Sequence, residues 1–295
     1  MGSKTCLLEG AAFDFHDAGA APRIMKDFYI NPYNAQTHME TSISKRRVAV
    51  VTGGAMGIGA EVCARLAAAG FAVVVADLDA AAADETAAGL CRQGSSVIAL
   101  PLDVAQPESV GRAFAQVDQE FGRCDVLVNC AGIAKVFAFL DFPLDNFQAT
   151  MAVNVTGTFL CAQAAARLML RHGWGRIVNI SSVAGLRAVG SGRTAYGTSK
   201  GAVIALTRQM AVELAEHGVT ANAVCPGPVD TPMTQAMHTE RFREEYSKAI
   251  PMNRYGSTGE IAAAVMYLVS EEARYVTGIA MPVDGGFLAS GARGL

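Results

Sequence analysis

The 295-residue sequence lacks long apolar runs and has no strong excess of charge of either sign. No segment approaches the roughly 18–20 consecutive apolar residues of a membrane-spanning helix, so we expect no membrane association. The formal net charge is −3, which gives no reason to expect nucleic acid or an anionic membrane as a partner.

Cysteine is sparse and irregularly placed. The seven cysteines form no CxxC pair and no Cys/His cluster. An odd number without regular spacing argues against both a disulfide framework and a zinc site. We therefore expect no metal, and we expect these thiols to be small buried side chains in a reducing, cytoplasmic environment.

Apolar residues make up 51% of the chain and charged residues 17%, which is typical of a well-buried core. Residues 1–44 differ, because they mix aromatic residues with prolines and charges and show no sustained period. They resemble neither a secretory signal nor a mitochondrial transit peptide. Two interpretations stay open: a flexible extension, with Met39 as an alternative start, or an arm that packs on a neighbouring subunit.

The pattern becomes regular from Arg46 onward. Apolar, β-branched runs occur at 48–51, 71–76, 97–100, 126–128, 177–180, 219–224 and 279–283. Segments of helical period lie between them at 60–69, 107–121, 144–170, 195–215 and 259–269. Buried strands that alternate with helices predict one α/β domain over 45–295, a doubly wound parallel sheet of about seven strands with helices on both faces (Rossmann-type).

A glycine-rich loop follows the first predicted strand. The sequence TGGAMGIG at 52–59 has glycines at 53, 57 and 59 and leads directly into a helix. Such glycines allow a tight turn and a close approach to a pyrophosphate, for which the helix N-terminus provides free N–H groups. The loop alone would equally suit an ordinary turn, but its position between strand and helix favours a dinucleotide site.

The second predicted strand ends in Asp77, about 20 residues beyond the glycines. A carboxylate at this place contacts the adenosine ribose hydroxyls and repels a 2′-phosphate. The glycine-rich loop has Ala55 and Met56 where a compensating cation would stand. The sequence therefore predicts NAD(H) over NADP(H). The alternative is that Asp77 only caps the next helix, for which Asp79 is the better candidate.

Tyr196 and Lys200 stand four residues apart where a Gly/Ser-rich loop gives way to a helical run. On a helix they share a face, and an ammonium beside a tyrosine stabilises the phenolate. Tyrosine then becomes a general acid/base for an alcohol or carbonyl oxygen. This spacing is common in proteins, so its meaning depends on its surroundings.

Two further features strengthen that interpretation. The strand IVNI ends in Ser181 and Ser182, and a serine there faces the crevice where open α/β sheets bind ligands. Asn154 lies in the apolar helical segment 151–157. By itself, such an amide is more often a satisfied core group than a functional one.

Together these features resemble the short-chain dehydrogenase/reductase family over residues 46–287. The resemblance rests on TGGAMGIG at 52–59, NCAG at 129–132, Asn154, Ser181-Ser182, YGTSK at 196–200, PGPVDT at 226–231 and VDGG at 283–286. It implies a homotetramer and a catalytic set in which Tyr196 is the acid/base. Lys200 would support its phenolate and bind the nicotinamide ribose, Ser182 would polarise the substrate oxygen, and Asn154 would hold a relay water.

The resemblance also implies how the cofactor is held. Asp77 takes the ribose, Asp103 flanks the adenine, and Val229 and Thr231 hold the nicotinamide carboxamide. The full implied cofactor set, which also includes Tyr196 and Lys200, is Gly53, Gly57, Ile58, Gly59, Asp77, Leu78, Asp103, Val104, Asn129, Ala131, Gly132, Pro226, Gly227, Val229 and Thr231.

The sequence departs from the family pattern at two points. Cys130 stands where the family has an amide, so one hydrogen bond must be made differently. Tyr196 follows Ser182 by fourteen residues, one more than the usual spacing. We attribute the extra residue to the Gly-rich loop 187–194. Either Ser181 or Ser182 then faces the pocket, and we favour Ser182.

Substrate specificity should come from the lid at about 231–255. Met233 and Met237 would cover the pocket or only pack the lid down, and residues 135–137 and 186–189 would form the other walls. The lid mixes positive and negative residues, so we expect a neutral secondary alcohol, diol, polyol or ketone. The nearest alternative is a 3-oxoacyl-[acyl-carrier-protein] reductase, suggested by IPMNRYG at 250–256. A non-catalytic NAD-binding regulator is the remote one.

Overall fold

The computed structural model describes residues 46–290. The extension predicted for residues 1–44 lies outside this range. Within it, no helix has the length and apolar character needed to cross a membrane.

Seven parallel strands form a single sheet in the order β3-β2-β1-β4-β5-β6-β7. Their bounds are β1 Val48–Thr52, β2 Ala72–Asp77, β3 Val97–Pro101, β4 Val126–Asn129, β5 Gly175–Ile180, β6 Val219–Pro226 and β7 Ala280–Val283. The strand order reverses between β1 and β4, and open α/β sheets bind ligands at such a switch point. The predicted doubly wound fold is confirmed.

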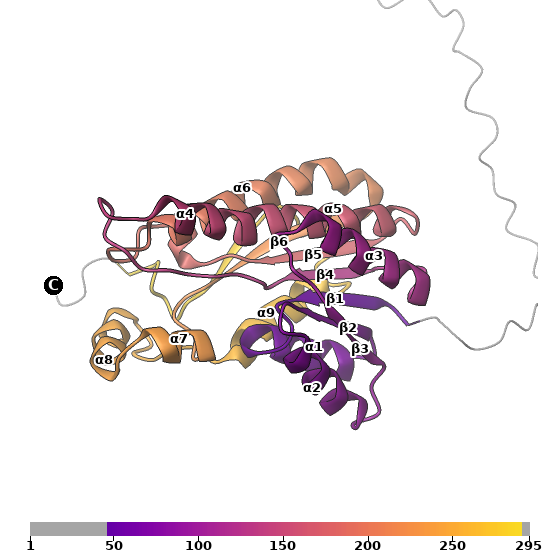
Figure 1. Ribbon diagram of the computed structural model, residues 1–295, viewed down its shortest axis with the longest axis horizontal. Helices are drawn as coiled ribbons and strands as arrows, with labels where there is room; N and C mark the ends of the chain where they lie inside the picture. The colour runs from indigo at the N-terminus through magenta and orange to yellow at the C-terminus, as the bar shows by residue number, and fades with distance from the viewer. Residues whose placement is uncertain (1–45, 291–295) are drawn as a thin grey trace, which may run out of the picture. The chain divides into compact units, whose positions relative to one another are not determined.

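Helices cover both faces of the sheet. α3, α5 and α6 lie on one face, and α1, α2 and α9 lie on the other (Figure 1). The bounds are α1 Gly57–Ala68, α2 Ala80–Cys91, α3 Pro107–Phe121, α4 Leu144–Met151, α5 Gly157–Leu170, α6 Thr194–Leu214, α7 Pro232–Met237, α8 Glu240–Ala249 and α9 Thr258–Val269. Because neither face meets water, all residues of β1, β4, β5 and β6 are buried.

The helix predicted over 144–170 is interrupted. α4 and α5 are joined by a single π-helical turn at Ala152–Thr156, so the helical path continues but widens at this turn. Such turns frequently mark functional sites. The turn holds Asn154, whose carbonyl accepts a hydrogen bond from the Thr158 hydroxyl at 2.8 Å. Hydrophobic periodicity does not reveal a one-residue insertion of this kind.

Among the described helices that cover the sheet, α2 is the one that the sequence analysis does not predict. Its Ala-rich sequence buries only Ala83, Ala87 and Leu90, so the apolar stripe barely stands out. Its cap is as predicted, because the Asp79 carboxylate accepts a hydrogen bond from the Ala82 N–H at 3.1 Å. Asp77 is therefore not needed as a helix cap.

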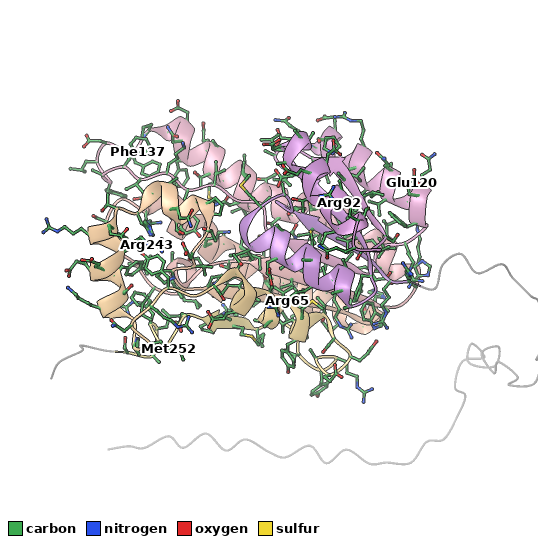
Figure 2. All side chains as sticks on the ribbon, turned by 90° about the horizontal axis from the view of Figure 1, so that it is seen from below. Arg65, Arg92, Glu120, Phe137, Arg243 and Met252 are labelled. Atoms are coloured by element: carbon green, nitrogen blue, oxygen red, sulfur yellow. The ribbon has the colours of Figure 1, made fainter. Side chains whose placement is uncertain are left out.

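The lid helices α7 and α8 lie at one end of the sheet, below it in the view of Figure 1. Phe137 and Arg243 lie at this end, whereas Arg92 and Glu120 lie at the other (Figure 2). Thr231 begins α7 and closes a reciprocal capping box with Thr234. The lid therefore starts directly after β6, at the carboxyl edge of the sheet.

Candidate active site

A cavity of about 400 Å³ opens at the carboxyl edge of the sheet. Its walls come from the loops after β1, β2, β3, β4, β5 and β6. Most of the residues proposed from the sequence line it: Gly53, Gly57, Ile58, Asp77, Leu78, Asp103, Val104, Ala131, Gly132, Ser182, Tyr196, Lys200, Pro226, Gly227, Val229 and Thr231. Met233 also lines the cavity, whereas Gly59, Asn129, Asn154 and Met237 do not.

The glycine-rich loop is built by close backbone contacts. A Cβ on Gly59 would lie 2.0 Å from the Gly53 carbonyl oxygen, so Gly59 supports the loop from behind. Gly53 has a φ of +63°, and its Cβ position lies 2.8 Å from the backbone of Ala131. α1 begins without a side-chain cap. Its first N–H groups therefore remain available to a phosphate, and the loop fits a dinucleotide.

Asp77 is held at the edge of the cavity by two backbone groups. Its carboxylate accepts hydrogen bonds from Ala55 N–H at 3.0 Å and from Asp79 N–H at 3.1 Å. Its neighbour Leu78 is 73% exposed and Met56 is 50% exposed. Among the described residues, Lys200 is the only cation that lines this cavity. Within residues 46–290, the wall that Asp77 and Leu78 form therefore contains no basic side chain to attract a 2′-phosphate.

Lys200 is 5% exposed and is tied to the end of β5. Its ammonium donates to the Ile180 carbonyl at 2.8 Å and lies 5.7 Å from the centre of the Tyr196 ring. Its own carbonyl accepts from the Ser181 hydroxyl at 2.8 Å. The Ser182 hydroxyl instead accepts from Ala184 N–H at 3.1 Å, and its own proton has no acceptor among residues 46–290. The geometry favours Ser182 over Ser181 as the serine that acts on a substrate.

Asn154 is fully buried, and both polar atoms of its side chain are hydrogen-bonded, with one lone pair of Oδ1 left over. Its Oδ1 accepts from Ile133 N–H at 2.8 Å, and its Nδ2 donates to the Ile133 carbonyl at 3.0 Å and to the Ser199 hydroxyl at 2.9 Å. A Cβ added to Gly132 would lie 3.3 Å from Asn154 Oδ1 and 3.4 Å from Lys200 Nζ. Because Gly132 has no side chain, the Asn154 amide and the Lys200 ammonium can both lie close to its backbone.

Asn129 belongs to a buried polar ladder that sequence reasoning missed. Its Nδ2 donates to Asn179 Oδ1 at 2.9 Å, and Asn179 Nδ2 donates to the Thr207 hydroxyl at 2.8 Å. The ladder joins β4, β5 and α6 behind the cavity. The sequence indicated this ladder only by the presence of two polar residues, Asn129 and Asn179, inside otherwise apolar segments. Next to Asn129, burial raises the pKa of the Cys130 thiol to about 11, which keeps it protonated and inert at neutral pH.

The walls predicted for the substrate, apart from Lys135, line a second cavity of about 830 Å³. Val136, Phe137 and residues 186–189 surround it. The loop between β5 and α6 that carries the extra residue has no regular structure from 187 to 193. It turns at Gly190 and Gly192, whose φ angles are +72° and +75°. These two glycines give the loop the freedom that the longer serine-to-tyrosine spacing requires.

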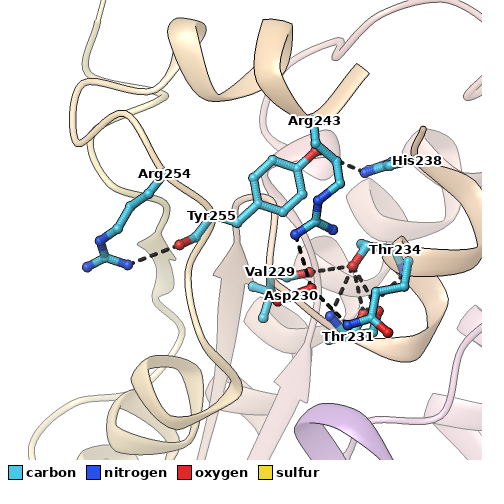
Figure 3. A network of polar contacts seen from close by, with 9 residues as sticks. Val229, Asp230, Thr231, Thr234, His238, Arg243, Arg254 and Tyr255 are labelled. Atoms are coloured by element: carbon cyan, nitrogen blue, oxygen red, sulfur yellow. Dashed lines mark hydrogen bonds and ion pairs between the residues drawn. The ribbon is translucent and has the colours of Figure 1, made fainter. Parts of the chain in front are cut away.

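A polar and aromatic cluster joins the lid to the start of α6. The Arg193 guanidinium donates to His238 Nε2 at 3.0 Å, and His238 Nδ1 lies 3.0 Å from the Tyr255 hydroxyl. Figure 3 shows the Tyr255 ring against Arg243, whose guanidinium lies 4.5 Å from the ring centre and contacts Asp230 at 3.1 Å. The sequence shows no sign of this cluster, because its members are far apart in the chain.

Burial sets the protonation states in this cluster. Burial, with Arg193 and Arg243 nearby, lowers the pKa of His238 below its ordinary value. Since a guanidinium has no acceptor, His238 must present the lone pair of Nε2 to Arg193 and carry its proton on Nδ1. Burial likewise raises the pKa of Tyr255 to about 12. His238 and Tyr255 are therefore both neutral near pH 7.

Comparison with known proteins agrees with this architecture. The family model described as "Enoyl-(Acyl carrier protein) reductase" matches residues 53–288. The 2-(R)-hydroxypropyl-CoM dehydrogenase of Xanthobacter autotrophicus is 42% identical over 82% of this chain and 99% of its own length. The 3-oxoacyl-[acyl-carrier-protein] reductase of Synechocystis is 39% identical over 82% and 97%. A gluconate 5-dehydrogenase from Burkholderia cenocepacia, solved with NADP and tartrate, has a TM-score of 0.80 at 33% identity over 83% and 96% of the two chains.

The chain therefore belongs to the short-chain dehydrogenase/reductase family. Members of this family bind a nicotinamide dinucleotide and act on hydroxy and keto groups. The chain is an oxidoreductase of that kind.

The contact behind the glycine-rich loop can be tested with Gly59→Ala. The added methyl group must displace the Gly53 carbonyl, so we expect dinucleotide affinity, measured by NADH fluorescence titration, to fall at least tenfold. Gly111→Ala is the matched control, because a Cβ at Gly111 in α3 meets nothing within 4 Å. Unchanged NADH affinity in Gly59→Ala would show that the loop does not hold the dinucleotide.

The lowered pKa of His238 makes a prediction about stability. Below about pH 6.5 the unfolded chain binds a proton at this histidine while the folded chain does not, so acidification must favour unfolding. We expect Tm to fall between pH 7.5 and pH 5.5, and to fall less in His238→Gln. His172→Gln replaces an exposed imidazole and is the control. An equal fall in wild type and His238→Gln would rule out the neutral, buried histidine.

Proposed function

We propose that the protein is an NAD(H)-dependent oxidoreductase that interconverts a secondary alcohol and the corresponding ketone. The substrate class would be a diol, polyol or other hydroxy compound. The observation that supports this most strongly is that Ser182, Tyr196 and Lys200 line the same cavity as the glycine-rich loop and Asp77. A proton-transfer group therefore faces the space that a dinucleotide would share with its substrate.

In the oxidative direction, Tyr196 would accept the hydroxyl proton of the alcohol. A nicotinamide held by the glycine-rich loop, Asp77 and Lys200 would supply the acceptor for the hydride of the carbinol carbon. Ser182 would donate a hydrogen bond to the same oxygen, because its own hydroxyl proton has no acceptor among the described residues. Carbonyl reduction is the reverse, with Tyr196 returning its proton to the oxygen.

Lys200 would stabilise the Tyr196 phenolate and bind the nicotinamide ribose. Its ammonium is buried, and of its three N–H groups one is taken by the Ile180 carbonyl. The other two are available to ribose hydroxyls. We propose that Asn154 holds a water that passes protons to Lys200, which the shared approach of Asn154 and Lys200 to Gly132 supports.

The preference for NAD rests on Asp77. Its carboxylate stands at the cavity edge, and Lys200 beside Tyr196 is the one cation of residues 46–290 that lines this cavity. A 2′-phosphate beside Asp77 would therefore meet its negative charge. The structural neighbour from Burkholderia holds NADP. The proposal of NAD for this chain therefore rests on Asp77 rather than on that likeness.

A 3-oxoacyl-[acyl-carrier-protein] reductase is the second candidate. The Synechocystis relative is named for this activity, and the family model is described by an acyl-carrier-protein substrate. Rapid reduction of 3-oxoacyl thioesters with NADPH, at rates above those of free alcohols and ketones, would favour it.

We also propose a homotetramer in the cytoplasm. Exposed apolar side chains on the outer helices support self-association, among them Leu144 of α4, Phe159 of α5 and Val212 of α6, which are 67%, 44% and 77% exposed. The described cysteines are all free thiols, as suits a reducing compartment.

The role of Tyr196 is tested by removing one oxygen. We expect Tyr196→Phe to lower kcat at least 100-fold in a panel of secondary alcohols and polyols with NAD, followed by NADH absorbance, because the acid/base is lost. NADH affinity should stay within a few-fold of wild type. Tyr275→Phe makes the same change at a fully exposed tyrosine and should retain activity. Retained turnover in Tyr196→Phe would contradict the mechanism.

The cofactor assignment predicts that NAD is preferred and that Asp77→Ser weakens the preference. Removing the charge abolishes its repulsion of the 2′-phosphate, so kcat/KM for NADP should rise about tenfold relative to NAD, or about 1.4 kcal/mol. Asp79→Ser is the control, because that carboxylate caps α2 and does not line the cavity. A wild-type enzyme that prefers NADP would refute the assignment of Asp77.

A further inference from the structure

We propose that the substrate carries a carboxylate, which binds to Arg193 and Arg187 beside Tyr246 while its hydroxyl or keto carbon faces Tyr196. The protein would then act on hydroxy and oxo acids. This inference rests on the proposed function and replaces the neutral substrate that the mixed charges of the lid suggested.

Arg187 is exposed, whereas Arg193 is half-buried. No carboxylate among residues 46–290 forms an ion pair with Arg187 or Arg193. Arg193 is half-buried and bonded to His238, which is neutral and cancels none of its charge. Positive charge in a partly buried place is unfavourable unless an anion accompanies it.

The negative residues of the lid do not fill this role. Glu240, Glu244 and Glu245 of α8 are exposed, and Glu245 pairs with Lys248 at 2.8 Å. Asp230 is already bonded to Arg243 at 3.1 Å, as Figure 3 shows. Arg187 and Arg193 lie before α6, outside the lid, and none of these acidic residues forms an ion pair with either of them.

Tyr246 connects these arginines to the reacting groups. Burial, which is the largest effect, and the nearby Tyr196 raise the pKa of Tyr246, whereas Arg193 and Arg187 act to lower it. The Tyr246 ring packs edge to face against His238 at 6.4 Å and against Phe287 at 5.5 Å, the two rings that Arg193 and Arg187 contact. Both arginines line the 830 Å³ cavity, whose wall also includes Gly197, the residue after Tyr196. Arg193 directly precedes α6 and stands three residues before Tyr196, so an anion bound to it lies about one helical turn from the proposed acid/base.

The remaining wall of this region is aromatic and apolar. The Tyr246 and Phe287 rings meet edge to face with centres 5.5 Å apart, and the Arg187 guanidinium lies 5.1 Å from the centre of Phe287. Val183, directly after Ser182, packs in the same cluster. Arg193 keeps several N–H groups beyond the one bonded to His238, and the planar guanidinium fork matches the two oxygens of a carboxylate.

The test compares acids with their own neutral esters. A series of 2-, 3-, 4- and 5-hydroxy acids and the corresponding methyl esters is assayed with NAD by NADH absorbance. We expect at least one acid to exceed its ester at least tenfold in kcat/KM. Arg193→Gln and Arg187→Gln should each lower kcat/KM for that acid at least tenfold, mainly through KM, and leave the ester within a factor of three.

The ester serves as an internal control, because a lid disturbed by the loss of the Arg193–His238 bond would impair acid and ester alike. Arg241→Gln removes an exposed charge from the same lid and should change neither substrate. If the enzyme turned over esters or neutral alcohols at the same rate as acids, the carboxylate site would be refuted and the proposed function would still hold. Equal losses for acid and ester in both arginine variants would overturn it too. No turnover of any alcohol, acidic or neutral, would overturn the proposed function itself.

Discussion

The geometry of the site depends on how Lys200 joins α6 to the end of β5. Its ammonium donates to the Ile180 carbonyl while its carbonyl accepts from Ser181, so two hydrogen bonds run in opposite directions across one junction. A Cβ on Gly185 would lie 2.6 Å from the Lys200 backbone, so a glycine is required there for α6 to come this close. This junction fixes Ser182 and Tyr196 on either side of the same space, although fourteen residues separate them.

Behind that junction, hydrogen bonds rather than apolar contacts hold the carboxyl edge of the sheet. Asn129, Asn179 and Thr207 form a buried ladder across β4, β5 and α6. Buried amides are costly unless they are hydrogen-bonded, so such a ladder ties the three elements to one mutual placement. Asn129 Oδ1 is the exception, because it is buried without a hydrogen-bond partner among the described residues. Asn154 is hydrogen-bonded to Ile133 in the loop after β4 and to Ser199 in α6, and so holds these two segments together.

Charge along the two cavities and the lid follows the chemistry proposed for each part. Asp77 is negative at the end proposed for the ribose, and Lys200 is positive beside Tyr196. Near the lid, Arg187 and Arg193 form no ion pair with a carboxylate of residues 46–290. The neutral His238 between Arg193 and Tyr255 holds the lid in place without reducing this positive charge. One chain of contacts therefore connects the lid, through the start of α6, to Tyr196.

The sequence alone determined the strands, the glycine-rich loop and Asp77, because each depends on local chemistry: period, backbone freedom at glycine, and a charged residue where a strand ends. It also indicated Ser182, Tyr196 and Lys200, which lie at the ends and starts of predictable elements. Only the tertiary structure decided that Asn154 lies in a π-helical turn, and which lid charges are paired. Arg193, His238 and Tyr255 come together by packing between segments up to 62 positions apart. Such contacts leave no periodic pattern in the sequence, because they form when folded helices and loops pack together and do not depend on neighbouring residues in the chain.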